Sequence, residues 1–403
     1  MPQSKNFNGE KMAVLSRAGP VYPGDRLVDF LRKLGLSATF LLAIAASEVQ
    51  PESSCWPWVQ ERADRLSIEG RPLITENVSS APNRFRPQPP VVAPRGIKIT
   101  YLGTGGFLIE RGQRAILTAP FFSNNSLWRV GVWKLDVREN SISRYTPNLK
   151  NAQAILVGHA HYDHLLDIPY LWRHHANHTI VYGNRSMGNI LAGADTPVAL
   201  QVLEHEVRRD GRSGAFKSTH RGQIQFMAIK SGHAPNFRLP PLDNWGLPLK
   251  ISPWSVEEPV ADLPRRTRGW RMGDPLAYII DFRDPADTSR VDFRIYYQDA
   301  GHIPEAWHWV ESAVDSVDLA IVTVASSNLI GQREFIRKVR AHIKPRHWLL
   351  GHWEDFFKVY SQDPESICSV PFTNPEGFVK KLLEEGVGEE RWVLPTPGTV
   401  LNY

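Results

Sequence analysis

The sequence predicts an α/β protein in which two β-sheets pack face to face between outer layers of helices, an αββα sandwich. From Ile97 onward, short β-type runs separated by glycines indicate an opening meander of strands: IKITYL, FLIE and AILT. Later β-type runs alternate with helical stretches, as is typical of sheets covered by helices. The chain has 403 residues, 42% of them hydrophobic, and can therefore bury one large core or two smaller ones.

The individual elements follow from the hydrophobic pattern. Residues 152–157 form a compact apolar run typical of a buried strand, which ends directly before Gly158. Later strands are expected at 180–182, 224–229, 277–282, 293–297, 319–324 and 348–350. Helices are expected at 165–173, 332–342 and 376–385. The sequence shows no internal repeat.

Residues 1–95 are expected to form an N-terminal extension to a main domain at 96–403. The extension is irregular and rich in proline towards its end. Residues 34–46 are an apolar run preceded by Arg32 and Lys33, too short to span a bilayer. The run suits either a secretory signal at about 26–46 or an amphipathic helix packed on the body. The signal interpretation slightly favours a secreted or periplasmic protein.

Charge and cysteine content restrict the function classes only weakly. The formal net charge is +5, but lysine and arginine are spread along the chain, so a nucleic-acid partner is disfavoured. The two cysteines, Cys55 and Cys368, exclude a disulfide framework and allow at most one bridge.

A histidine cluster follows the apolar run in the order His159-Ala160-His161-Tyr162-Asp163-His164. Alternate residues of an extended loop point to the same side, so the first two histidines can reach one metal ion. The aspartate and the third histidine, where the chain turns into a helix, face a neighbouring position. Without metal, so many titratable groups after an apolar strand would be poorly satisfied. The cluster therefore predicts two cations that share one loop.

A catalytic zinc site normally has three protein ligands and an open position for water, so further ligands are needed. His233, Asp299 and His352 each follow a predicted strand and supply one histidine for each ion and one carboxylate to bridge them. His302 is expected either to contact substrate or donate a proton, or to be an exposed loop residue. Tyr162 is expected to pack or to support the ligands. The histidines of the sequence HHANH are expected at an exposed helix end: His174, His175 and His178.

The His-x-His-x-Asp-His motif, with a later histidine, aspartate and histidine at strand ends, resembles the metallo-β-lactamase superfamily. Tyr101-Leu102-Gly103, the motif through Leu165, and Gly351-His352-Trp353 are similar to the branch of N-acyl-phosphatidylethanolamine phospholipase D and ascorbate-phosphate lactonases. The resemblance covers residue 97 to the C-terminus.

The resemblance implies a ligand set for each ion. One ion would be held by His159, His161 and His233, and the other by Asp163, His164 and His352, with Asp299 bridging both. The superfamily usually has Thr-Asp-Pro after its third strand, whereas this chain has Thr118-Ala119-Pro120. A carboxylate that would support the ligating histidines is therefore missing, which implies altered metal affinity or selectivity.

The implied activity is hydrolysis, in which two metal ions, expected to be zinc with iron or manganese as alternatives, activate a bridging hydroxide. Asp163, Asp299 and His302 are the expected catalytic residues, and a phosphodiester or a lactone or ester is the expected substrate, either a small molecule or lipid-like. The alternative is a nuclease of the same fold, although such enzymes usually carry a basic and aromatic arm. A di-iron redox protein would have glutamate at the position of His161, and a non-enzymatic role is disfavoured by the complete ligand set.

Residues 237–270 form an insertion rich in proline and tryptophan. It is long for a plain connector and leaves directly from the loop of His233. Its Trp245, Trp254 and Trp270 offer apolar surface, so we expect a lid or wall over the metal site. A loop packed on the extension or in an oligomer contact is the alternative.

Overall fold

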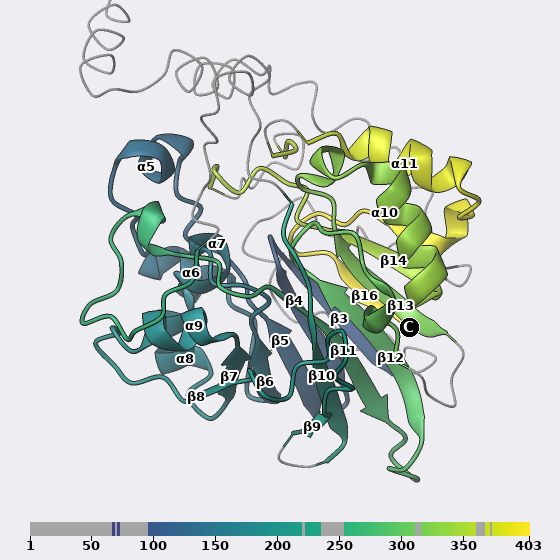
Figure 1. Ribbon diagram of the computed structural model, residues 1–403, viewed down its shortest axis with the longest axis horizontal. Coiled ribbons are helices and arrows are strands. Elements are labelled where there is room, and N and C mark those ends of the chain that lie inside the picture. The colour runs from purple at the N-terminus through teal and green to yellow at the C-terminus, as the bar shows by residue number, and fades with distance from the viewer. Residues whose placement is uncertain are drawn as a thin grey trace, which may run out of the picture. The chain divides into compact units, whose positions relative to one another are not determined.

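The computed structural model describes residues 67–68, 71–72, 96–219, 222–234, 254–310, 316–359, 367–370 and 373–403. All of these residues lie in the compact unit Pro51–Tyr403. Two seven-stranded sheets pack face to face, and helices cover the outer face of each (Figure 1). The expected αββα sandwich is therefore confirmed.

Most of the expected extension lies outside the described residues, including the signal interpretation of 26–46. Its described parts are β1 (Ser67–Ile68) and β2 (Arg71–Pro72), which pair antiparallel. Among the described helices, none is long and apolar enough to cross a bilayer. Cys368 is disulfide-bonded, and Cys55 lies outside the described residues.

The first sheet has the strand order β16-β3-β4-β5-β6-β7-β8. Its strands are β3 (Ile97–Gly103), β4 (Gly106–Arg111), β5 (Arg114–Thr118), β6 (Ala152–Leu156), β7 (Ile180–Gly183), β8 (Leu200–Val202) and β16 (Val400–Asn402). Pairing is antiparallel from β16 to β5 and parallel from β5 to β8.

The second sheet has the order β15-β14-β13-β12-β11-β10-β9. Its strands are β9 (Lys217–Ser218), β10 (Ile224–Lys230), β11 (Leu276–Arg283), β12 (Val291–Gln298), β13 (Val317–Thr323), β14 (Pro345–Gly351) and β15 (Trp392–Val393). Pairing is antiparallel from β9 to β12 and parallel from β12 to β15. The two sheets thus share one series of strand directions, a repetition that the sequence does not reveal.

The outer helices differ between the two sheets. The first sheet is covered by α5 (Leu127–Val132), α6 (Glu139–Tyr145), α7 (Tyr162–Leu165), α8 (Ile168–His175) and α9 (Arg185–Leu191). The second is covered by α10 (Gln332–Lys338), the π-helix η6 (Val339–Ile343) and α11 (Pro375–Glu384). Short 3₁₀ turns are η3 (Thr267–Gly269), η4 (Ala306–His308), η5 (Ser327–Leu329) and η8 (Glu389–Arg391). The single helix expected at 165–173 is instead two, because α7 ends at Leu165 and α8 begins at Ile168.

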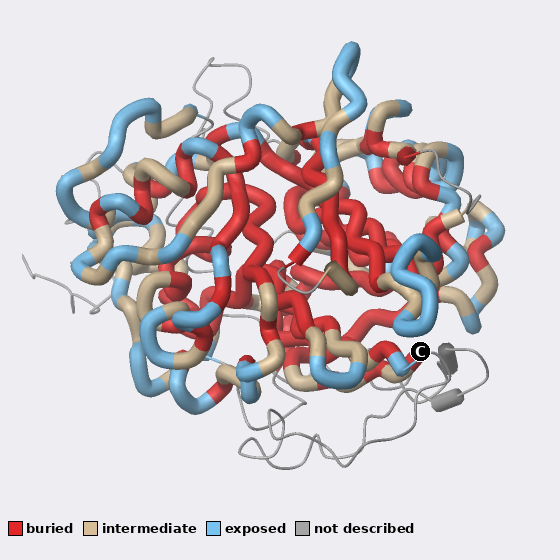
Figure 2. Tube along the Cα trace, turned by 90° about the horizontal axis from the view of Figure 1, so that it is seen from below, coloured by how far each residue is buried: buried red, intermediate tan, exposed pale blue. Residues whose placement is uncertain are grey.

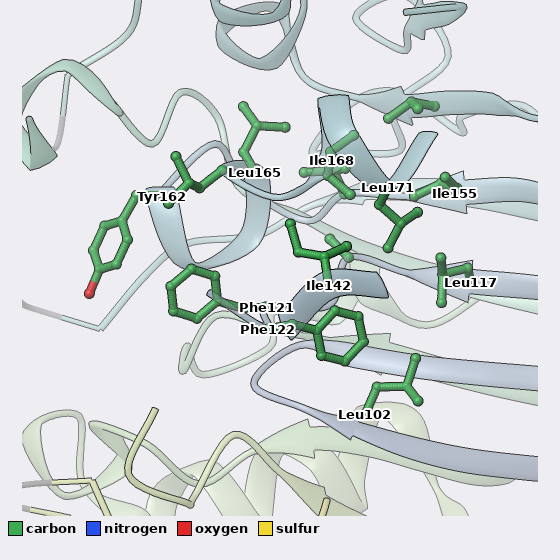
Figure 3. Close-up of a cluster of buried hydrophobic side chains, with 14 of the residues drawn as sticks. Leu102, Leu117, Phe121, Phe122, Ile142, Ile155, Tyr162, Leu165, Ile168 and Leu171 are labelled. Carbon is green, nitrogen blue, oxygen red and sulfur yellow. The ribbon is translucent and has the colours of Figure 1, made fainter. Parts of the chain in front are cut away.

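The core lies in three layers of buried side chains. Figure 2 shows the backbone of the buried residues in red in the interior of the trace. The middle layer fills the space between the sheets and includes Tyr101, Phe107, Tyr278 and Tyr297. The layer under the helices of the first sheet includes Tyr162, whose hydroxyl points away from the neighbouring side chains (Figure 3). The expected packing role of Tyr162 is therefore confirmed.

Strand direction explains where a site can form. In the second sheet β10, β12, β13 and β14 all run the same way, so their carboxyl ends meet at one edge. The loop after β6 of the first sheet faces this edge, because Gly158 in that loop contacts Asp299 after β12. Loops at the carboxyl ends of strands are the usual site of chemistry in α/β proteins.

A polar ladder crosses the second sheet on its outer face. Arg294 holds Asp281 through two hydrogen bonds, of 2.6 Å from Nε and 2.7 Å from Nη2, and Gln225 Nε2 donates to the same carboxylate over 2.9 Å. Asp318 accepts the backbone N–H of Arg294 on one side and contacts Arg346 on the other. The side chains of Asp281 and Arg294 are 0% and 3% exposed, so this ion pair is almost free of solvent.

Replacing Arg294 by alanine is expected to lower the free energy of unfolding by about 3–5 kcal/mol, because the buried Asp281 side chain would lose its cationic partner and keep only the hydrogen bond from Gln225. Chemical denaturation measures the change. Arg346→Ala is the control, since the Arg346 side chain is 53% exposed and its pair with Asp318 is worth less than about 1 kcal/mol. Equal losses in the two variants would contradict the role given to the buried pair.

Candidate metal centre

The motif loop has the geometry that its sequence predicts. His161 is extended, with φ −66° and ψ 156°, and α7 begins at the next residue. The rings of His159 and His161 therefore lie on the same side, with centroids 4.7 Å apart. Asp163 lies in the first turn of α7, where a carboxylate is favoured by the helix dipole.

The second sheet brings the three later residues to the same place. His233 follows β10, Asp299 follows β12 and His352 follows β14. Each forms a group with motif residues in which one ligand atom per residue lies within 4.8 Å of the others: His159, His161 and His233; His159, His164 and Asp299; Asp163, His164 and His352. The structure thus brings together all seven residues that the sequence predicts as ligands.

Of the three groups, the one that contains Asp299 shares a histidine with each of the other two, which we call the outer groups: His159, His161 and His233, and Asp163, His164 and His352. Its Oδ1 is 3.1 Å from His159 Nδ1, its Oδ2 is 3.4 Å from His164 Nδ1, and Gly158 N–H donates to Oδ2 over 3.2 Å. Burial alone would raise the pKa of Asp299, but the neighbouring His164 and His159 lower it to about 2. The group is therefore an anion that faces both sides of the centre.

Asp163 is also an anion, and it belongs to the group with His164 and His352. Its Oδ2 lies 3.5 Å from His164 Nε2 and 3.4 Å from His352 Nε2. Burial raises the pKa of this carboxyl, but His164 and His352 outweigh burial and leave the pKa well below its usual value.

His161, His164 and His233 are neutral, and several ring nitrogens of the site lack hydrogen bonds. Burial lowers the pKa of His161 well below its usual value, that of His164 to about 3 and that of His233 to about 4. Several buried ring nitrogens have no hydrogen-bond partner among the described residues: His159 Nε2, His161 Nε2, His164 Nδ1 and Nε2, and His352 Nδ1. Such atoms cost about 1–3 kcal/mol each unless something binds them. Neutral imidazoles and carboxylates are the donor set of zinc and similar cations, so these residues fit a metal centre.

Tyr297 supports Asp299, although sequence analysis did not single it out. Its hydroxyl lies 3.2 Å from Asp299 Oδ2 and donates to Gly105 O over 2.7 Å. The signal was present in the chain, because residues two apart in a strand share a face and Tyr297 precedes Asp299 by two.

The segment Thr118-Ala119-Pro120 has no acidic side chain where the superfamily usually has one. Thr118 Oγ1 donates to Gly105 O over 2.6 Å and accepts Phe107 N–H over 2.7 Å. Ala119 is fully buried in the apolar layer under the helices. The methyl group of Ala119 thus contributes packing where a carboxylate would contribute hydrogen bonds.

His302 lies beside the centre but in none of the three groups found among the described residues. Gly232 precedes His233, and a Cβ at Gly232 would lie 2.2 Å from the ring of His302, so the loops of His233 and His302 are in close contact. His302 lines a recess of about 460 Å³ together with Ser231, Glu305, Trp307 and His308. The HHANH sequence lies at and just after the end of α8. His174 and His178 are exposed as expected, but His175 is only partly exposed.

The insertion is described only from Trp254 onward, and 237–253, with Trp245, lies outside the described residues. Trp254 is 65% exposed. Trp270 is 0% exposed and its Nε1 donates to Pro264 O over 2.9 Å, so the expectation that it offers apolar surface over the site is wrong. Its indole instead fills the layer under the helices of the first sheet. The hydrophobic gain from burying so large a ring stabilises this position, although Trp270 lies in a loop.

The chain is similar to a UPF0173 metal-dependent hydrolase from Cupriavidus taiwanensis, with 24% identity over 280 residues that cover 66% of this chain and 82% of the relative. No family model matches the chain.

The chain also matches solved structures at low sequence identity. Igni18, a metallo hydrolase from Ignicoccus hospitalis, has 13% identity and a TM-score of 0.46, covering 76% of this chain and 98% of its own. The metallo-β-lactamase fold protein YhfI from Bacillus subtilis has 12% identity and a TM-score of 0.40, covering 76% and 99%. The branch of phospholipase D enzymes and lactonases suggested by the sequence stays a prediction.

Proposed function

We propose that the protein is a metal-dependent hydrolase whose centre holds two metal ions. The observation that carries this proposal is the overlap of the three donor groups. The middle group, His159, His164 and Asp299, shares His159 with one neighbouring group and His164 with the other, so the side chains provide two adjacent positions. The similarity to a metal-dependent hydrolase supports it.

In this proposal His159, His161 and His233 hold one ion, Asp163, His164 and His352 hold the other, and Asp299 contacts both. The ligand set is rich in histidine and has no thiolate, which favours zinc over iron or manganese. When bound, such a pair supplies Lewis acidity and a water molecule whose pKa is near neutral.

The side chains around the centre then have distinct roles. Asp299, an anion held by Gly158 N–H and close to the Tyr297 hydroxyl, accepts and passes on the proton of the attacking water. His302, on the recess beside Gly232, contacts the substrate or donates a proton to the leaving group. The ligating histidines orient the ions and take no part in proton transfer.

The proposed substrate is a phosphodiester or a lactone or ester. Both classes develop negative charge on an oxygen in the transition state, which a cationic centre stabilises. A screen of phosphodiesters, lactones, thioesters and β-lactams separates the classes.

The purified protein is expected to contain up to two transition-metal ions per chain, with zinc the main element. Elemental analysis measures the content, and activity in the substrate screen is expected to disappear with a strong chelator and to return with zinc. If the protein contained no bound metal and chelators left its activity unchanged, the proposal would be wrong.

A further inference from the structure

Glu354 connects the two sheets next to the candidate metal centre. It follows β14 of the second sheet, and its side chain is buried, with 1% of the residue exposed. The Tyr101 hydroxyl donates to Oε2, and Thr104 N–H donates to Oε1 over 2.5 Å. Tyr101 lies in β3 of the first sheet and Thr104 follows that strand. The carboxylate thus receives both of its hydrogen bonds from the opposite sheet.

Tyr101 passes this connection on to His352. The backbone N–H of His352 donates to the Tyr101 hydroxyl oxygen over 2.8 Å, while the same hydroxyl donates to Glu354. The tyrosine ring is held by stacking on Phe107, with centroids 4.8 Å apart. The backbone of a predicted metal ligand is therefore fixed by a buried chain of hydrogen bonds.

Two residues bound by this chain have strained backbones. His352 has φ +53° and Thr104 has φ +51°, in the left-handed region where a side chain with Cβ costs about 1–2 kcal/mol. Such conformations persist only when surrounding contacts hold them, and they cluster at functional sites. Glu354 supplies such contacts to both residues, directly to Thr104 and through Tyr101 to His352.

The strained turn at Thr104 also reaches a second predicted ligand. The next residue is Gly105, and a Cβ there would lie 2.7 Å from His164 Nδ1, so its backbone packs directly against that ring. Both His352 and His164 belong to the group with Asp163. The ring of His233, in the other outer group, is oriented differently, by a hydrogen bond of 2.7 Å between its Nδ1 and Ala234 O.

We propose that Tyr101 and Glu354 are positioning residues that set the metal affinity of one of the two sites, the Asp163–His164–His352 site. The inference rests on the proposed function, because it takes these three residues as ligands. The two residues act through His352 and the Thr104–Gly105 turn and hold no ion themselves.

The test compares metal binding by the full chain and by Tyr101→Phe and Glu354→Gln variants. Metal-free protein is titrated with Zn²⁺ in competition with a chromophoric chelator, and a His352→Ala variant identifies the binding event that belongs to this site. We expect both variants to weaken that event by about 10–100-fold, as loss of supporting hydrogen bonds typically does, and to leave the other event within about twofold. Glu354→Gln keeps the shape of the side chain but replaces one of its two acceptor oxygens by an NH₂ group, so one of the two hydrogen bonds is lost without loss of packing.

Tyr296→Phe is the matched control. Tyr296 is also a buried tyrosine with a bonded hydroxyl, 2.9 Å from His308 Nδ1, but it belongs to the layer under α10 and α11. Both binding events should be unchanged in it. The inference is overturned if Tyr101→Phe and Glu354→Gln, folded by circular dichroism, bind both ions as the wild type does, or if both events weaken equally. Wild-type protein that binds no Zn²⁺ contradicts the proposed function itself and is thereby distinguished.

Discussion

Replacement of Asp299 by alanine is expected to lower kcat/KM by at least about 10³-fold, or about 4 kcal/mol of transition-state stabilisation, while the protein stays folded. The carboxylate lies 3.1 Å from His159 and 3.4 Å from His164, so its loss would remove the proposed bridge and the proposed proton acceptor together. Steady-state kinetics on the best substrate of the screen, together with elemental analysis, measure the effect. Asp163→Ala and His161→Ala are expected to behave alike.

Asp136→Asn is the control for this prediction. The Asp136 side chain is 51% exposed and lies 3.8 Å from Arg129, so its replacement should leave kcat/KM unchanged. An Asp299→Ala variant that kept a rate near that of the wild type with full metal content would show that this residue is not a ligand.

Adding a methyl group at Gly158 is expected to lower kcat/KM by about 10²-fold. A Cβ at this position would lie 2.1 Å from Asp299 Oδ1, so the carboxylate must shift from its place beside His159 and His164. A displacement of about 1 Å at a reacting centre commonly costs that much. Kinetics and the metal content of Gly158→Ala measure the result.

Gly377→Ala offers a matched clash away from the centre. A Cβ at Gly377 in α11 would lie 2.7 Å from Asn374 Nδ2, again against a polar side chain, and activity should not change. Equal losses in the two variants would mean that the effect of Gly158→Ala is a general loss of stability.

The motif loop could be predicted because its information is local. Six consecutive residues after an apolar strand define both the extended step from His159 to His161 and the turn into α7. His233, Asp299 and His352 could be predicted from their places after strands, since strands that run the same way end at one edge. Which residues lie opposite one another across the two sheets is not encoded locally, and it comes only from the register of the strands.

The residues that escaped prediction owe their roles to tertiary contacts. Glu354 is an ordinary glutamate in sequence, and only the approach of β3 to β14 gives its carboxylate two buried donors. Trp270 looks like part of an exposed loop, but its ring is buried in the layer under the helices. The hydrophobic pattern predicted one helix at 165–173, but the structure has a break between α7 and α8. At this break the Asp167 carboxylate accepts the N–H groups of Phe122 and Ser123, a contact that periodicity in the sequence does not report.

The position of β16 affects how the chain reaches its folded state. This last strand pairs antiparallel with β3, the first strand of the same sheet in chain order, and forms the edge of that sheet. Contacts between segments so distant in sequence require closure of a very long loop, which slows folding. Until residues 400–402 have left the ribosome, β3 presents an unpaired edge to its surroundings. β3 has seven residues and β16 only three, so the edge exposed during synthesis is longer than the edge left in the folded sheet, and aggregation is most to be expected at that stage.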